Sequence, residues 1–347
     1  MSRIRFFDTT LRDGSHAVKH QLKKKTIEDY CKAIDEAGVY TVIVGHGNGL
    51  GASSLQVGFS LLSDSEMLNT ARLNLSRTKL GAYLIPGFGT IEDDIKPALQ
   101  SGVELFKIGC HCTEADVTRQ HIEYVKNTGN EAYGVLMMYH LASTERLLEE
   151  AQKMQSYGAD GVIIMDSAGA STPEMVKRTV SMLADNLHIA VGFHPHNNMG
   201  LAVANAYTAI KEGATIIDGT VRGFGAGAGN VQLEAIIALL EKEGYELDTN
   251  LYRLLDISEQ IVKPIMIEDR ALTDISIVSG MSGVFSAFKE HVLNAAKRFG
   301  IDARDIFMEL GRRKVIAGQE DMIVEVAEKL AHPLKEDEES YMLSSLA

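Results

Sequence analysis

The sequence predicts an α/β fold, an eight-stranded TIM (β/α)8 barrel with a C-terminal helical extension. Short runs rich in β-branched residues alternate with amphipathic stretches, a pattern typical of a parallel sheet with crossover helices. Eight such units fill roughly 250 residues, the usual size of this barrel. Polar residues follow nearly every predicted strand, which favours the closed barrel over a doubly wound sheet built from the same units.

The predicted strands are short apolar runs that end in polar or glycine-containing turns. In chain order they cover residues 4–7, 40–44, 80–84, 105–108, 132–138, 161–165, 189–193 and 215–217. The predicted helices between them cover residues 24–36, 92–100, 143–156, 172–184 and 201–211. The residues that follow the strands are therefore expected to meet at one end of the barrel, where active sites of this fold lie.

Beyond about residue 229 the alternation stops and only helical patterns follow. They cover residues 234–242, 251–263, 283–298, 303–310 and 319–330, which is more helix than the last layer of a barrel needs. We therefore expect a catalytic barrel domain over residues 1–264 and a helical domain over residues 265–347. The tail from Lys335 is acidic and is expected to fray.

Composition excludes several classes of protein. A formal net charge of −13 argues against a general nucleic-acid binder, which would present a basic surface. No signal peptide is expected, because the first residues resemble a strand, and no apolar run reaches the roughly 20 residues that span a bilayer. Cys31, Cys110 and Cys112 cannot all pair, which indicates a reducing compartment. The expected location is the cytoplasm, with no membrane or nucleic-acid partner.

Two histidines end the seventh predicted strand. His194 and His196 are two residues apart, so their side chains face the same side of the strand. Asp13, close to the end of the first strand, is the best candidate for a third, hard ligand. Two imidazoles and one carboxylate leave positions on a metal ion open for substrate and water. Two polar loop histidines are the simpler alternative, but the Arg12-Asp13 pair favours the metal site.

Arg12 and His16 flank the predicted ligand Asp13. A guanidinium at this place can stabilise an enolate or carboxylate oxygen by charge-assisted hydrogen bonds, although a structural salt bridge with Asp8 is an alternative. The imidazole of His16 titrates in the range that suits a general base. A surface histidine explains its position equally well.

Two further patterns are given structural rather than cofactor interpretations. The glycine-rich run at residues 223–230 has the spacing of a dinucleotide loop, but it ends the β-α series instead of opening a new unit. It is interpreted as a turn that lets the backbone approach a ligand or metal. Cys110, His111 and Cys112 are too close together for an ordinary structural zinc site.

Taken together, the motifs resemble those of 4-hydroxy-2-oxovalerate aldolases, within the wider HMG-CoA lyase-like group of metal-dependent TIM-barrel lyases and Claisen synthases. The run DTTLRDG at residues 8–14, followed by His16, is similar to the opening of these aldolases. The resemblance continues through GHGNGLGASS at 45–54, CTEADVTRQH at 112–121, DSAGA at 166–170, GFHPHNN at 192–198, GAGAGN at 225–230 and GQEDMIV at 318–324. It covers nearly the whole chain.

The resemblance implies a carbon–carbon lyase that cleaves 4-hydroxy-2-oxopentanoate, or a longer 4-hydroxy-2-oxo acid, to pyruvate and an aldehyde. It implies a divalent cation on Asp13, His194 and His196, with Mn²⁺ as first choice and Mg²⁺ or Co²⁺ as alternatives. His16 would be the general base, and Arg12 would stabilise the enolate.

The same resemblance implies a set of substrate contacts and exposes departures from the family pattern. The implied contacts are Arg12, Asp13, Ser167, His194 and the residue at position 285. Phe285 and Met281 stand where tyrosines are usual, and Asn48 replaces a usual aspartate. We therefore expect a more apolar pocket, which leaves the aldehyde chain length and the stereoselectivity at C4 open.

A partner is also implied by the resemblance. Family members work with an acylating acetaldehyde dehydrogenase, in a heterotetramer of two aldolase and two dehydrogenase subunits that channels the aldehyde, in aromatic hydrocarbon catabolism. The helical extension is the natural place for that contact. Three alternatives remain, namely a Claisen-type synthase that joins an acyl-CoA to a 2-oxo acid, a non-haem iron oxygenase, and a non-catalytic scaffold subunit.

Overall fold

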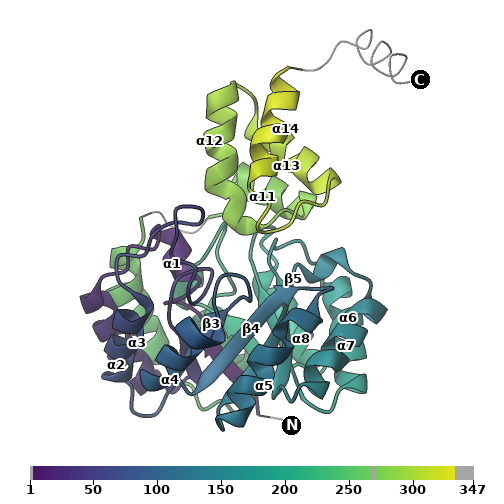
Figure 1. Ribbon diagram of the computed structural model, residues 1–347. Coiled ribbons are helices and arrows are strands. Elements are labelled where there is room, and N and C mark those ends of the chain that lie inside the picture. The colour runs from purple at the N-terminus through teal and green to yellow at the C-terminus, as the bar shows by residue number, and fades with distance from the viewer. Residues whose placement is uncertain (1–2, 268–270, 333–347) are drawn as a thin grey trace.

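Eight parallel strands close into a barrel in the order of the chain, with β8 paired to β1, which confirms the predicted fold. The computed structural model describes residues 3–267 and 271–332. The strands are β1 (Arg5–Asp8), β2 (Thr41–Ile43), β3 (Lys79–Leu84), β4 (Leu105–His111), β5 (Glu131–Met137), β6 (Gly161–Asp166), β7 (Ala190–Pro195) and β8 (Ile216–Gly219). Their carboxyl ends point toward the C-terminal helices (Figure 1).

Helices surround the barrel, and two of them were not predicted. The outer helices are α2 (Lys24–Ala37), α3 (Asp64–Arg72), α4 (Lys96–Gln100), α5 (Arg119–Asn127), α6 (Thr144–Ser156), α7 (Pro173–Asn186), α8 (Ala202–Lys211), α9 (Leu233–Lys242) and α10 (Leu251–Ile257). The sequence analysis missed α3 and α5. Each has nine residues.

Side chains fill the barrel, and a polar network closes its amino-terminal end. The carboxylate of Glu131 accepts hydrogen bonds from the hydroxyls of Tyr40 and Tyr133, at 2.8 Å each, and pairs with Lys79. Apolar interior side chains such as Phe7 and Ile163 pack above this network. The interior therefore has a polar layer at its amino-terminal end and apolar side chains above that layer.

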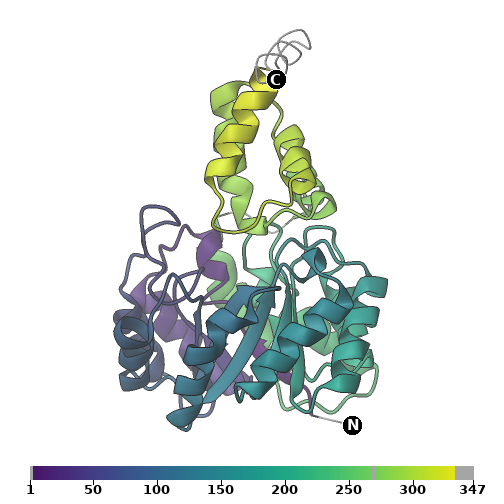
Figure 2. The same ribbon diagram turned by 45° about the vertical axis from the view of Figure 1, so that its right-hand side comes forward.

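The residues beyond the barrel form a helical unit with its own hydrophobic core, which confirms the predicted extension. Its helices are α11 (Asp274–Ser282), α12 (Lys289–Phe299), α13 (Ala303–Arg312) and α14 (Asp321–Ala331). Figures 1 and 2 show this C-terminal unit above the carboxyl ends of the strands. The acidic tail from Lys335 lies outside the described residues.

The helix predicted over residues 283–298 is wrong in its first turns. Gly283 ends α11 with a φ of +70°, a conformation that favours glycine, and α12 begins only at Lys289. Apolar residues interspersed with serine and glycine continue on both sides of Gly283, and α11 itself was not predicted. The break matters because it lies directly above the barrel mouth.

Three hydrogen bonds join this break to the loops of the barrel. The ring Nε2 of His140 lies 3.0 Å from the carbonyl oxygen of Gly283. The N–H of Ser286 donates to the carbonyl of Ser167 at 3.0 Å, and its hydroxyl donates to Asn198 at 3.1 Å. Phe285 lies between these anchored residues, so its position depends on both units.

Candidate active site and metal centre

Asp13 is buried in the turn that follows β1. The turn is held by Asp8, whose carboxylate accepts hydrogen bonds from the N–H and hydroxyl of Thr10 and from the hydroxyl of Tyr30. The Oδ1 atom of Asp13 accepts the N–H of Ala226 at 3.0 Å, in the glycine-rich run. A Cβ atom at Gly225 would lie 1.7 Å from Asn230, so glycine is required for this close approach.

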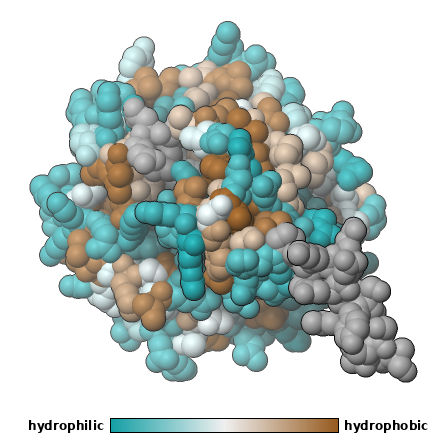
Figure 3. Space-filling model, turned by 90° about the horizontal axis from the view of Figure 1, so that it is seen from above, coloured by the Kyte–Doolittle hydropathy of each residue, from teal (hydrophilic) through white to brown (hydrophobic). Residues whose placement is uncertain are grey.

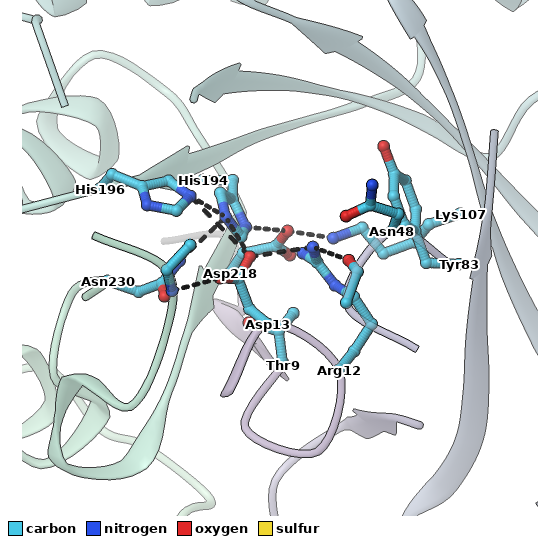
Figure 4. A network of polar contacts seen from close by, with 12 residues as sticks. Thr9, Arg12, Asp13, Asn48, Tyr83, Lys107, His194, His196, Asp218 and Asn230 are labelled. Carbon is cyan, nitrogen blue, oxygen red and sulfur yellow. Dashed lines mark hydrogen bonds and ion pairs between the residues drawn. The ribbon is translucent and has the colours of Figure 1, made fainter. Parts of the chain in front are cut away.

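His194 and His196 converge on the other carboxylate oxygen of Asp13. Their Nε2 atoms are 3.3 Å apart, and they lie 3.5 and 3.8 Å from Asp13 Oδ2 (Figure 4). Burial lowers the pKa of His196 to about 3, so its imidazole is neutral at neutral pH. The geometry thus brings the three predicted ligands together, from the ends of β1 and β7.

These three residues fit a divalent cation. An ion about 2.1 Å from each ligand needs ligand atoms about 3.0–3.5 Å apart, close to the spacing found here. Burial alone would raise the pKa of Asp13, but the charge of Arg12 and the two histidines hold it well below 3.8. The site therefore presents one anion and two imidazoles on one side, with the opposite side left to substrate and water.

Asp218 and Lys107 support this centre from the barrel interior, and the sequence analysis missed both. Asp218, on β8, lies 2.8 Å from Nδ1 of His194 and pairs with Lys107 of β4. Both side chains are fully buried. An Nδ1–H donated to a carboxylate leaves the Nε2 lone pair facing the ion, an arrangement common around metal-bound histidines. No sequence motif marks this pair, because 111 residues separate its members.

Arg12 lies next to the three potential metal ligands, and only part of its guanidinium is hydrogen-bonded. Its Nη1 donates to Asp13 at 2.9 Å and to the carbonyl of Gly47 at 3.1 Å. The guanidinium carbon lies 4.8 Å from the centre of the Tyr83 ring. Its Nε and Nη2 are buried and meet no acceptor within residues 3–267 and 271–332. Buried donors of this kind are suited to an anionic ligand.

His16 is half-buried on the short helix α1 (Gly14–Ala17) at the mouth. Burial, aided by the charge of Arg12 and opposed by that of Asp13, lowers its pKa below 6.5. Its ring lies 5.0 Å from that of His20, which is stacked on His46 at 3.7 Å. A neutral imidazole at this position can accept a proton.

A cavity of about 100 Å³ connects Arg12, Asp13, His16 and His196. The remaining wall is mostly apolar and consists of Tyr83, Ile85, Phe88, Met137, Met165 and Phe285. Asn48 also lines it, as do Ala317, Gly318 and Glu320 of the C-terminal unit. The space corresponds to three or four water molecules, which suits a ligand of few atoms.

Ser167 and Met281 lie apart from this cavity. The hydroxyl oxygen of Ser167 accepts the N–H of Met138 at 3.1 Å, and the residue is fully buried in the joint between the two units. Met281 is 61% exposed on α11. Of the sequence-predicted site residues, the structure therefore gathers Arg12, Asp13, His16, His194, His196 and Phe285 and leaves Ser167 beside them.

Comparisons with known proteins identify the family of both units. Residues 3–261 match the HMGL-like family and residues 271–332 match the DmpG-like communication domain. The 4-hydroxy-2-oxovalerate aldolase of Pectobacterium atrosepticum is 52% identical over 95% of this chain and 96% of its own. That of Spirochaeta aurantia is 51% identical over 93% of this chain and 95% of its own.

The barrel and its ligand set define a metal-dependent lyase of the HMGL-like class. Within that class, the chain belongs to the 4-hydroxy-2-oxovalerate aldolase family of carbon–carbon lyases. The carboxyl transferase domain of Rhizobium etli pyruvate carboxylase shares the fold, with a TM-score of 0.80 at 14% identity over 96% of this chain and 61% of that chain. None of the described helices is both long enough and apolar enough to cross a membrane.

The Asp218–His194 contact predicts how the centre responds to mutation. We expect Asp218→Asn to weaken Mn²⁺ binding by about 10- to 100-fold, because the amide no longer fixes and polarises the His194 ring. Titration followed by electron paramagnetic resonance of free Mn²⁺ measures the dissociation constant. Asp166→Asn is the matched control, since Asp166 is also buried but binds the N–H groups of Ala170 and Ser171. Equal affinity in the two variants would contradict the role of Asp218.

Proposed function

We propose that this chain cleaves 4-hydroxy-2-oxopentanoate, or a longer 4-hydroxy-2-oxo acid, to pyruvate and an aldehyde by a retro-aldol reaction. The observation that carries the proposal is one small cavity bordered by Asp13 and His196 of the potential metal site, by Arg12 and by the imidazole of His16. The Nε and Nη2 atoms of Arg12 have no acceptor among the described residues. Retro-aldol cleavage of a 4-hydroxy-2-oxo acid needs three groups. They are a metal ion that the 2-oxo acid can chelate, a cation beside the oxygen that becomes negative, and a base for the C4 hydroxyl.

In this proposal Asp13, His194 and His196 hold a divalent cation, preferably Mn²⁺ and alternatively Mg²⁺ or Co²⁺. The ion, when bound, supplies Lewis acidity toward the 2-oxo group. A single carboxylate among the three ligands would cancel only part of the charge of a divalent ion, which favours an anionic substrate. The side of the triad that faces the cavity is where that substrate binds.

The protein residues perform the remaining chemistry. His16 takes the proton from the C4 hydroxyl, and the C3–C4 bond breaks as the C4 oxygen becomes the carbonyl of the aldehyde. The electron pair remains on the pyruvate half as an enolate, whose oxygen Arg12 stabilises through Nε and Nη2. The enolate then takes up one proton at C3, equal in number to the proton lost from the hydroxyl, and becomes pyruvate. A second, open cavity of about 510 Å³ also borders His16, which gives this base access to solvent protons.

We also propose the substrate contacts that family membership implies, at Arg12, Asp13, Ser167, His194 and Phe285. Phe285 closes the cavity without offering a hydroxyl, so the aldehyde end of the substrate meets a mostly apolar wall. Without a hydroxyl at position 285, we expect weaker discrimination between the two C4 enantiomers. Ser167 would contact substrate only after a local rearrangement, since its hydroxyl oxygen already accepts the N–H of Met138.

We propose that residues 1–264 form the catalytic domain and residues 265–347 the contact with an acylating aldehyde dehydrogenase. The match to a communication domain supports this. Large apolar side chains are exposed on the unit at Ile277, Met281, Met308 and Leu330. Figure 3 shows apolar surface among hydrophilic side chains on this upper face. Such surfaces are typical of protein–protein contacts.

The lyase activity has a direct test. With Mn²⁺ present, the chain should release pyruvate and acetaldehyde in equal amounts from 4-hydroxy-2-oxopentanoate; a chelator should abolish release and fresh Mn²⁺ restore it. His194→Ala should lose both metal binding and turnover, whereas the control His188→Ala, at an exposed histidine, should keep both. Release of CoA from acetyl-CoA and a 2-oxo acid, without cleavage of the hydroxy acid, would indicate a Claisen-type synthase instead.

The role of His16 predicts the acid side of the pH profile. Only the neutral imidazole can accept a proton, and burial lowers its pKa below 6.5. We therefore expect kcat/KM to stay constant as the pH falls through 6.5 and to decline only at a lower pH. His16→Ala should lower kcat by about 10²- to 10⁴-fold and remove that decline. A decline centred above pH 6.5 in the unaltered enzyme would argue against this base.

The partner contact predicts a complex of defined mass. Light scattering after mixing with an acylating aldehyde dehydrogenase should give two subunits of each chain. Met281→Glu should weaken the complex by about tenfold or more, because it places a charge on the exposed apolar face of α11. Leu73→Glu is the matched control, as Leu73 is 85% exposed on the outside of the barrel. Equal weakening of the complex by both variants would show that α11 does not form the contact.

A further inference from the structure

Tyr83 is a buried phenol in the wall of the catalytic cavity. It lies on β3 and faces the barrel interior, where only 2% of its surface is exposed. Its ring packs against the guanidinium of Arg12, 4.8 Å from ring centre to guanidinium carbon. The chemistry proposed for the site assigns Tyr83 no role, although it borders the same cavity as Arg12 and His16.

The hydroxyl of Tyr83 lacks a strong acceptor. Within the part of the chain that the structure describes, its one hydrogen bond goes to the sulfur of Met137, at 3.0 Å. A thioether is a weak acceptor, so most of the donor's capacity is unused. Burial raises the pKa of Tyr83, which keeps the proton on the oxygen. The cavity wall therefore holds a neutral O–H donor beside a poor acceptor.

The neighbouring strand makes room for this phenol. A Cβ atom at Gly109, on β4, would lie 2.2 Å from the Tyr83 oxygen, closer than any non-bonded contact allows. Glycine inside a strand costs conformational entropy and contributes no packing, so it marks a close approach. The Tyr83 phenol therefore lies where the adjacent strand has no side chain.

The location of Tyr83 indicates which half of the substrate it meets. Arg12 contacts Asp13 on one side and the Tyr83 ring on the other. Figure 4 shows the ligand triad and Tyr83 on opposite sides of Arg12. A 2-oxo acid anchored at the triad extends past Arg12, so its aldehyde half reaches the part of the cavity that Tyr83 and Phe285 line.

We propose that Tyr83 is a substrate-contacting residue that donates a hydrogen bond to the C4 oxygen of the 4-hydroxy-2-oxo acid, and that it provides the phenol that Phe285 does not. This inference rests on the proposed lyase function. The phenolic O–H of Tyr83 positions the C4 hydroxyl of the substrate for proton removal by His16. The phenolic proton stays on the Tyr83 oxygen throughout. No proton leaves Tyr83, so His16 remains the base.

Removal of the hydroxyl alone tests the proposal. Tyr83→Phe should lower kcat/KM for 4-hydroxy-2-oxopentanoate about 3- to 10-fold, the value of one hydrogen bond between neutral groups. Pyruvate has no C4 oxygen, so its inhibition constant against cleavage should not change. Tyr139→Phe is the matched control, because Tyr139 is equally buried but does not line the cavity.

A second substitution tests whether a hydroxyl at position 285 can replace the hydroxyl removed from Tyr83. Phe285→Tyr in the Tyr83→Phe background should recover most of the lost kcat/KM, since both side chains border the same small cavity. Unchanged kcat/KM in Tyr83→Phe would overturn the proposal. A parallel weakening of pyruvate inhibition would also overturn it, because that result means that Arg12 has moved. No cleavage by the unaltered chain would instead reject the lyase function itself.

Discussion

The site depends on the burial of one carboxylate, that of Asp13, among groups that compensate its charge. Its two oxygens contact Arg12, two imidazoles and the backbone N–H of Ala226. An isolated ionised carboxylate in such a place would be strongly destabilised. These contacts come from β1, β7 and the glycine-rich run after β8, so closure of the barrel is what brings the compensating groups together.

Charge balance explains how the centre can exist with or without a ligand. Four buried charged groups are linked by ion pairs around the triad: Arg12 and Lys107 are positive, Asp13 and Asp218 are negative, and these four sum to zero. A divalent cation would add two positive charges at the mouth. A 2-oxo acid in its enolate form carries two negative charges, one on the carboxylate and one on the enolate oxygen. The protein therefore approaches neutrality again when the charge of the reaction is greatest.

The parts of this site that could be predicted are those close together in sequence. His194 and His196 share a strand face, and Arg12 and Asp13 are neighbours, so local spacing reveals their chemistry. Lys107, Asp218 and Tyr83 are single residues on separate strands, and only the register of the closed barrel brings them beneath the ligands. The fold was predictable for the same reason, because β-α alternation is local. Helix α11 was not predicted, because its apolar residues alternate with serine and glycine and do not gather on one helix face.

The C-terminal unit completes the cavity as well as covering it. Phe285 and the turn at residues 317–320 form part of the wall, and both belong to the helical unit. Their distance from the barrel is set by the hydrogen bonds from Gly283 and Ser286 to loops after β5, β6 and β7. A cavity of about 100 Å³ gains or loses a large fraction of its volume when one wall shifts slightly. A displacement of the unit against the barrel therefore changes the shape of the cavity, because the unit supplies part of its wall.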